Sequence, residues 1–135
     1  MIGVCLATAG LAAAVVTTSL PLPGFTLAWT HSIEKTRWEE DYQVLSTADG
    51  PRLQLTEARI HGSGAGMEPP PDAVLAGGVW HYRPPLAPLE RLHLARSDYV
   101  ADYSICWDGR CRGLAELAGP PAAAPQVEIY ACPPP

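Results

Sequence analysis

Two residues suited to acid–base or metal chemistry, His31 and Glu40, lie in the stretch WTHSIEKTRWEEDY at residues 29–42. If each half of this stretch is a strand, both share a face with Trp29 and Trp38, because alternate residues of a strand point the same way. Such a pair can be a base with its orienting acid, or two ligands of a metal ion. It can also be a buried polar pair whose members satisfy each other's hydrogen bonds. The sequence favours the buried polar pair and leaves the functional site, catalytic or metal-binding, open.

A hairpin formed by the two halves of this stretch would place the pair close together. Pairing His31 with Trp38 sets the expected register of the hairpin. Trp29 then lies opposite Glu40, and His31 becomes a diagonal neighbour of that carboxylate, about 7–8 Å away at the backbone. Glu34 falls in the loop above the same end of the hairpin. We therefore expect His31, Glu34 and Glu40 to cluster there.

Other catalytic arrangements find little support in the sequence. Ser32 follows His31 directly, and neighbours along a strand point to opposite faces, so they cannot be nucleophile and base for each other. The remaining histidines lack the spacing of a zinc or copper site, which needs three or four converging ligands. One of them, His93, lies between two leucines and is expected to face solvent. We expect no cofactor and favour a protein that is not an enzyme, with His31 and Glu40 as the candidate metal pair.

The stretch GSGAG at residues 62–66 has the composition of a phosphate-binding glycine loop. The sequence EPPPD follows it where a helix would have to begin, so the loop lacks a helix dipole for phosphate. A flexible turn with Gly64 and Gly66 at positive φ is the favoured interpretation. Such a turn can close over the expected cluster around His31.

After residue 24 the chain shows short strand patterns separated by turn residues, and no helical period persists. The expected strands are residues 25–31, 38–45, 53–61, 77–83, 89–96, 99–107, 110–117 and 127–132. This pattern predicts an all-β fold of about seven or eight strands, either an antiparallel β-sandwich or a small barrel. The expected organisation is an N-terminal segment at 1–24, a β domain at 25–117, and a Pro/Ala-rich linker with a last strand and tail at 118–135.

The N-terminal segment is uncharged and mostly apolar from residue 2 to residue 20, and Pro21 and Pro23 follow it. This pattern predicts an apolar helix that directs export, as a cleaved signal peptide or a retained membrane anchor. A buried core helix is the structural alternative. Export places the protein in the periplasm or another extracytoplasmic space, with membrane attachment if the segment is retained.

The cysteines agree with export. The Asp-Gly dipeptide at residues 108–109 is preferred in a two-residue type I′ hairpin, which sets Cys106 opposite Cys111 in a non-hydrogen-bonded pair. We therefore predict a Cys106–Cys111 disulfide, favoured over half of a metal site because no second cysteine pair lies nearby. The state of Cys132 is left open; among the four cysteines, Cys5 is the only one that remains to pair with it.

The charge balance argues against one class of partners. The chain has 9 Lys and Arg against 14 Asp and Glu, which gives a formal net charge of −5 at pH 7. No cluster of basic residues is present to neutralise phosphates, and aromatic residues alternate with acids rather than with bases. We therefore expect no nucleic-acid partner.

The motif HSIEKT with a downstream acidic pair, followed later by GSGAG, resembles the bacterial domain-of-unknown-function family 1850. The resemblance extends from about residue 25 to residue 117, with Ile33 where the family has Val. The residues that carry it are His31, Ser32, Glu34, Thr36, either Glu39 or Glu40, Gly64 and Gly66.

The resemblance implies a small envelope protein encoded beside tripartite (TRAP) transporters of the TAXI type. It implies an accessory binding module whose partner is the transporter permease or its solute-binding protein. The candidate residues for binding a ligand or partner are His31, Ser32, Glu34, Glu40, Gly64 and Gly66. No catalytic residue carries over, and the alternative is a small metal-binding protein or metal-dependent enzyme that uses His31 and Glu40.

Overall fold

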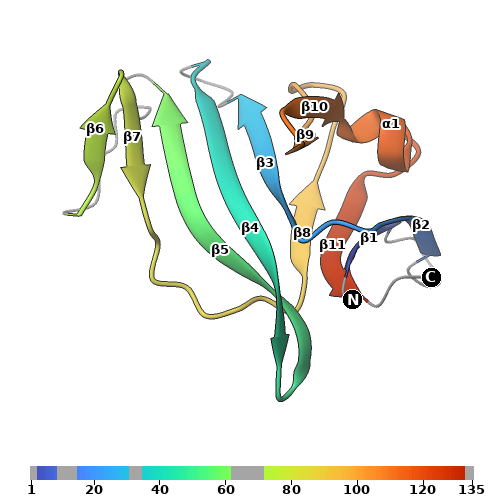
Figure 1. Cartoon of the computed structure of the whole chain (residues 1–135). Helices are drawn as coiled ribbons and strands as arrows, with labels where there is room; N and C mark the ends of the chain where they lie inside the picture. Colours follow the sequence, from blue (N-terminus) through green and yellow to red (C-terminus); the bar gives the residue numbers. More distant parts are fainter. Residues whose placement is uncertain (1–2, 9–14, 31–34, 62–71, 133–135) are drawn as a thin grey trace.

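A computed structural model describes residues 3–8, 15–30, 35–61 and 72–132 of the chain. Within these ranges the protein is mostly β, and its strands form two antiparallel sheets (Figure 1). In the same described ranges the helical part is one short element, α1 (Leu114–Ala118). The predicted all-β class is therefore confirmed.

The smaller sheet brings together segments from both ends of the chain. Its strands, in spatial order, are β2 (Val15–Leu20), β1 (Gly3–Thr8), β11 (Gln126–Cys132) and β8 (Leu92–Ala95). The last predicted strand is thus an inner strand of this sheet, between β1 and β8, and not a peripheral one.

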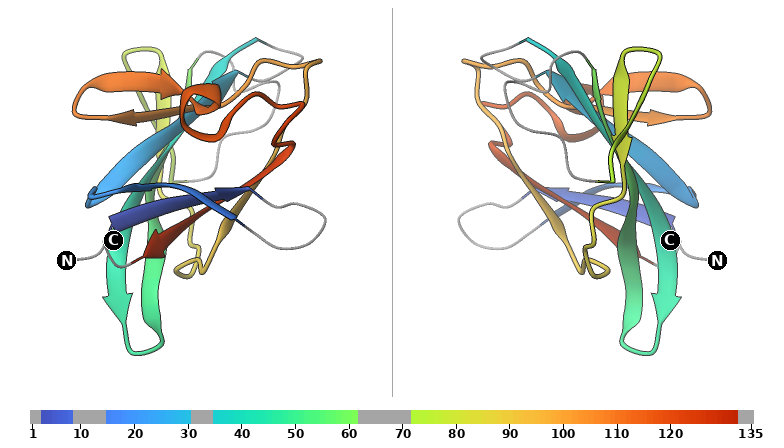
Figure 2. Two further views of the ribbon diagram at one scale, coloured as in Figure 1. Left: turned by 90° about the vertical axis from the view of Figure 1, so that its right-hand side faces the viewer. Right: turned by 90° about the vertical axis from the view of Figure 1, so that its left-hand side faces the viewer.

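The larger sheet contains most of the predicted strands. In spatial order they are β10 (Arg110–Gly113), β9 (Ser104–Trp107), β3 (Gly24–Thr30), β4 (Arg37–Thr47), β5 (Gly50–His61), β7 (Val79–Tyr82) and β6 (Val74–Ala76). The long hairpin of β4 and β5 projects at its turn beyond the smaller sheet (Figure 2).

The prediction of an apolar helix at the N-terminus is wrong, because this segment forms two strands. β1 pairs with β11 on one side and with β2 on the other, and its Val4 and Leu6 are each 1% exposed. A short apolar run without a clear period fits a buried strand as well as a helix, so the sequence pattern alone did not distinguish them. No helix in the described part of the chain is long and apolar enough to cross a membrane.

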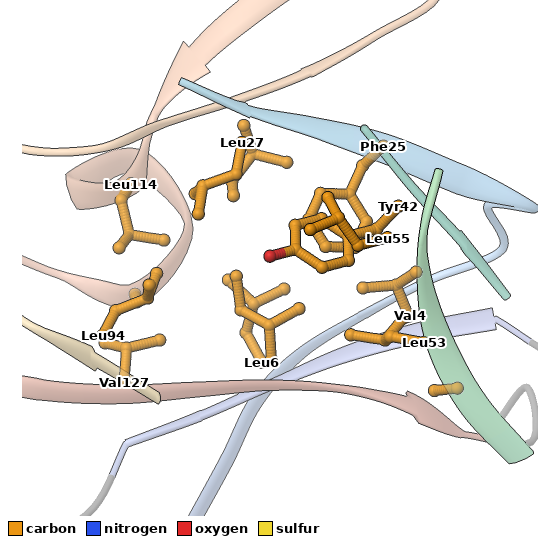
Figure 3. Close-up of a cluster of buried hydrophobic side chains, with 14 of the residues drawn as sticks. Val4, Leu6, Phe25, Leu27, Tyr42, Leu53, Leu55, Leu94, Leu114 and Val127 are labelled. Carbon is orange, nitrogen blue, oxygen red and sulfur yellow. The ribbon is translucent and has the colours of Figure 1, made fainter. Parts of the chain in front are cut away.

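The hydrophobic core lies between the two sheets and takes side chains from both (Figure 3). Val4, Leu6 and Val127 come from the smaller sheet, and Leu27 and Tyr42 come from the larger one. None of these five residues is more than 3% exposed. Burying an aliphatic or aromatic side chain of this size contributes about 1.5–3 kcal/mol, so this shared core holds the two sheets together.

The register of the first hairpin differs from the predicted one. Trp29 pairs with Trp38 and Phe25 with Tyr42, so the predicted pairing of Trp29 with Glu40 is wrong by two residues. Aromatic pairs across strands stabilise a sheet, and here the ring centroids lie 5.3 Å apart for Phe25 and Tyr42 and 6.2 Å apart for the tryptophans. A shift of two residues leaves every side chain on its predicted face, so Glu40 still lies on the face of the tryptophans.

The strand predicted at residues 110–117 is shorter than expected, because β10 ends at Gly113 and α1 follows it. Leu114 opens the helix and is fully buried. The two prolines and small residues after α1 form a turn that leads into β11. The helix therefore closes the end of the core next to β9 and β10.

One buried cation holds this end of the molecule together. The Arg96 side chain is 0% exposed and donates to both carboxylate oxygens of Asp102, at 2.9 and 2.7 Å. It also donates to the carbonyl oxygens of Ala124 at 2.9 Å and Gly119 at 2.7 Å. A buried guanidinium is costly unless it is paired, so these bonds fix the segments around it.

Candidate functional site

Of the residues predicted to bind a ligand or partner, Glu40 is the one that the structure describes. The other predicted residues lie outside the described ranges: His31, Ser32, Glu34, Gly64 and Gly66. The strand ends that border their segments lie at one end of the larger sheet, because Thr30 pairs with Arg37 and Trp38 pairs with Ile60. The expected proximity of His31 and Glu40 stays a prediction.

Glu40 lies half-buried on the inner face of β4, the face that is turned toward the core. Tyr42 Oη donates a hydrogen bond to Glu40 Oε1 at 2.9 Å. Burial raises the pKa of the Glu40 carboxyl, and the hydrogen bond from Tyr42 opposes that rise. Burial and the nearby Glu40 charge both raise the pKa of the Tyr42 hydroxyl, so it stays a donor at neutral pH.

Two further tyrosines are influenced by the Glu40 carboxylate. Burial raises the pKa of Tyr82, and the charge of Glu40 raises it further. Burial, then the charges of Asp102 and Glu40, raise the pKa of Tyr103. The sheet register explains why the charge of Glu40 acts on Tyr82, because Glu40 pairs with Ala58, which in turn pairs with Tyr82.

Several aromatic residues share the inner face of the sheet with Glu40. The Trp29 ring lies 6.2 Å from that of Trp38 and 6.0 Å from that of Tyr103, measured between centroids. Both tryptophans and Tyr103 are only half-buried. We call this set the inner aromatic surface; its residues are Trp29, Trp38, Glu40, Tyr42, Tyr82 and Tyr103.

A pocket of about 210 Å³ opens beside the inner aromatic surface, at Trp29 and Tyr103. Ser97, Arg96 and Asp102 also line it, but the last two are already paired with each other. Ligand clefts for drug-sized molecules have volumes of about 300–1,000 Å³. The pocket therefore suits a single side chain or a small head group.

The opposite face of the larger sheet carries charged side chains in place of rings. Arg59 donates to both Asp41 oxygens, at 2.6 and 2.7 Å, and to Glu39 Oε1 at 3.2 Å. Arg37 Nε donates to Glu39 Oε2 at 3.0 Å, and His61 Nε2 lies 2.8 Å from Glu39 Oε1. We call these five residues the outer ionic network.

The outer ionic network keeps Glu39 ionised. Burial acts to raise the pKa of Glu39, but hydrogen bonds from His61, Arg37 and Arg59 outweigh burial and lower the pKa to about 2. Neighbouring Glu40 has no such cationic partner among the residues that the structure describes, and its pKa is raised by burial. The two consecutive carboxyls point to opposite faces, as the strand alternation predicts, and they also differ in chemistry, which the sequence alone does not reveal.

Comparison with known protein families identifies the family of this chain. Residues 25–114, more than half of the protein, match the family model described as Domain of unknown function (DUF1850). The chain belongs to the DUF1850 family. No curated protein and no solved structure matches it.

The DUF1850 region coincides with the larger sheet. It contains essentially all of the larger sheet, whose strands are β3 to β7, β9 and β10, together with β8 of the smaller sheet. The other strands of the smaller sheet, β1, β2 and β11, lie outside it. The inner aromatic surface and the outer ionic network both fall within this region. Thr36, Glu39 and Glu40, which carry part of the sequence resemblance, lie at the start of β4 or just before it.

The described part of the DUF1850 protein adds no support for a metal site. No group of three or more His, Cys, Asp and Glu side chains is placed there to hold a metal ion. His93 faces solvent as predicted, with its side chain 67% exposed. A pair formed by His31 and Glu40 stays a prediction, because His31 lies outside the described residues.

Both cysteine pairs form disulfides. Cys106 pairs with Cys111 in the predicted register, and a disulfide joins their sulfurs. Cys5 is bonded to Cys132, which resolves the assignment that the sequence left open. The second bond joins β1 to β11 and therefore ties the N-terminal segment to the rest of the smaller sheet.

Sequence reasoning missed Arg59, His61 and Tyr82 as neighbours of the motif. The signal for two of them was present, because in β5 the polar Glu57, Arg59 and His61 alternate with Ala58 and Ile60. That period places the polar residues on one face of the strand. Which strand lies beside β5 is set by tertiary pairing, so the partners of these residues could not be named.

Proposed function

We propose that this DUF1850 protein is an extracytoplasmic binding module that acts with a TAXI-type TRAP transporter, and that its inner aromatic surface binds a partner without performing chemistry. Its two sheets form a β-sandwich in this proposal, and the inner aromatic surface makes contact with the transporter permease or its solute-binding protein.

The Glu40 carboxyl is the observation that carries the proposal. It lies half-buried on an apolar face, and its hydrogen bond comes from Tyr42. No ion pair joins it to a cation within the part of the chain that the structure describes. A partly buried carboxylate without a cation is unfavourable for folding alone, which favours a role in binding.

The chemistry around Glu40 indicates what it would bind. A carboxylate offers an ion pair to an ammonium or guanidinium group, and the faces of Trp29, Trp38 and Tyr103 offer cation–π contacts. The pocket of about 210 Å³ beside Trp29 and Tyr103 has room for one such group. A lysine or arginine side chain of a partner, or a ligand with a cationic head group, fits this site.

Two observations support the location and the partner. Disulfides persist in oxidising compartments outside the cytosol, and this chain has two of them. The association with a TAXI-type transporter is supported by the resemblance of the HSIEKT and GSGAG motifs, which is an argument from family neighbourhood.

The proposal is tested by capture of the full chain with transporter subunits. The tagged protein is cross-linked in the envelope of cells that contain the permease and its solute-binding protein, and both are quantified in the captured material. We expect Glu40→Gln to reduce capture about tenfold or more while the protein stays folded, because the cation of the partner loses its counter-ion. Glu116→Gln is the matched control, since it removes the same charge from an exposed position on α1.

Equal capture by the Glu40→Gln and Glu116→Gln variants would show that the inner aromatic surface is not the contact. A stoichiometric transition metal in the purified protein, lost in a His31→Ala variant, would instead establish the metal-binding alternative. Absence of both transporter subunits from the wild-type capture would remove the transporter partner.

A further inference from the structure

The Cys106–Cys111 disulfide lies at the edge of the larger sheet, on the face of the outer ionic network. It spans a separation of five residues, Cys111 is exposed and Cys106 is half-buried. The Cys5–Cys132 disulfide spans a separation of 127 residues, and its cysteines are only 6% and 5% exposed. A reagent in solution can therefore reach the hairpin disulfide while the protein remains folded, but not the other.

Arg37 places a positive charge beside the hairpin sulfurs. Its Nη2 lies 3.7 Å from Cys111 Sγ and 4.0 Å from Cys106 Sγ. Glu39 holds the guanidinium through its Nε at 3.0 Å, which leaves Nη2 directed at the disulfide. A cation next to a cysteine favours the thiolate, and thiolates are the nucleophiles and leaving groups of disulfide exchange.

A groove of about 340 Å³ on the same face leads to Cys106. Thr26, Asp41, Gln43 and Thr56 are among the residues that line it. The register places Thr26, Cys106 and Cys111 in one row across β3, β9 and β10. A nucleophile lying in the groove above Thr26 therefore approaches Cys106 from the side opposite Cys111, which is the line that displacement at sulfur requires.

We propose that the Cys106–Cys111 hairpin is a thiol–disulfide exchange site for a dithiol-bearing polypeptide segment that lies in this groove. It adds an activity that does not depend on the proposed transporter contact, which uses the opposite face of the sheet.

The exchange has two balanced steps. A thiolate of the partner forms a bond to Cys106 Sγ, the Cys106–Cys111 bond breaks, and its electron pair leaves on Cys111 Sγ beside Arg37. The second thiolate of the partner then attacks the partner sulfur of the mixed disulfide and releases Cys106 as a thiolate. The partner dithiol loses two electrons and becomes a disulfide, and the hairpin takes up those electrons as two thiols, with the protons exchanged through solvent.

The site is tested on the full folded chain with a reduced thioredoxin-type protein as the probe. Its Cys-x-x-Cys dithiol is added, free thiols are alkylated at intervals, and each cysteine is followed by peptide mass spectrometry. We expect Cys106 and Cys111 to be reduced while Cys5–Cys132 stays oxidised and circular dichroism stays unchanged. Reduction of both disulfides together, only as the protein unfolds, would overturn the proposal.

The direction of attack is tested with a probe that keeps only its attacking cysteine and cannot complete the second step. After rapid alkylation, we expect the probe to be bonded to Cys106 and the alkyl group to be on Cys111. The reverse assignment, or no covalent adduct, would contradict attack from the groove.

The role of Arg37 is tested by the rate of hairpin reduction by the dithiol probe. Arg37→Gln should slow the reaction about fivefold, because the leaving thiolate of Cys111 loses its cation, and Arg37→Lys should restore most of the rate. Arg110→Gln is the matched control; it removes a charge from an exposed position in the same hairpin and should change the rate less than about twofold. Equal rates for all three variants would remove Arg37 from the mechanism.

A polypeptide partner is distinguished from a small thiol by narrowing the groove. Gln43→Trp should slow reduction by the protein probe and leave reduction by glutathione unchanged, since a small thiol does not need the groove. Leu45→Trp, on the same strand but outside the groove residues, is the steric control. Reaction with glutathione that is faster than with the protein probe, and equal in all variants, would rule out a polypeptide substrate.

Discussion

The two faces of the larger sheet are built from the same strands but stabilise the protein in different ways. On the inner face, Leu27 and Tyr42 exclude water, and Glu40 is the exception among apolar neighbours. On the outer face, Glu39 and Asp41 are paired with arginines and remain partly accessible to solvent. Adjacent residues of one strand therefore differ in the sign of their electrostatic contribution, because a strand turns each neighbour to the opposite side.

The largest difference between the faces should appear when neighbouring residues of β3 are truncated. Leu27→Ala removes a side chain that is 2% exposed, and we expect a loss of about 2–5 kcal/mol because a cavity remains in the core. Thr26→Ala on the outer face removes a 2.7 Å hydrogen bond to Asp41 and should cost about 1 kcal/mol. Urea unfolding at neutral pH measures both, and equal losses would contradict the assignment of the faces.

The next largest effect is expected from Arg59, the cation that joins two carboxylates of the outer ionic network. Its side chain is 21% exposed, so solvent weakens the interaction, and Arg59→Met should cost about 1–3 kcal/mol. Arg52→Met is a control that removes an arginine from the same strand but outside the network. The free energies of unfolding should differ between the two variants at low salt and converge as salt is added.

Glu39 should make stability depend on acidity in one direction. Its pKa is about 2 in the folded protein against 4.5 for an unperturbed glutamate, so its contribution is present above about pH 4.5 and is lost as the pH falls toward 2. Glu39→Gln should therefore be less stable than wild type at pH 7, with the difference shrinking as the pH falls. Unfolding free energies measured from pH 7 to pH 2 check this, and a difference independent of pH would contradict it.

The smallest effect is expected from Glu40, and it has the opposite sign. Burial raises its folded pKa, so the folded state holds the proton more tightly than the unfolded chain does. Its contribution is present below the unfolded pKa and is lost as the pH rises through the folded pKa. Glu40→Gln should remove this decline, seen as a flatter dependence of unfolding free energy on pH above about pH 4.5. An unchanged dependence would mean that Glu40 is not desolvated.

The sequence by itself determined which residues share a face. The alternation in WEEDYQVL separated Glu40 from Glu39 before any fold was known, and the Asp-Gly turn fixed Cys106 opposite Cys111. These are local properties, since the strand period and the turn type act over a few residues. The family motif likewise consists of two short stretches of sequence, so it was visible without the fold.

Tertiary structure decided what those faces meet. The first hairpin is shifted by two residues because Trp29 with Trp38 and Phe25 with Tyr42 form aromatic pairs, and a local pattern is satisfied equally by either register. The N-terminal segment forms strands because β11, far along the chain, offers β1 a hydrogen-bonded partner. Such long-range pairing depends on the packing of the whole domain, and for that reason the Cys5–Cys132 bond and the neighbours of Glu40 could not be derived from the sequence alone.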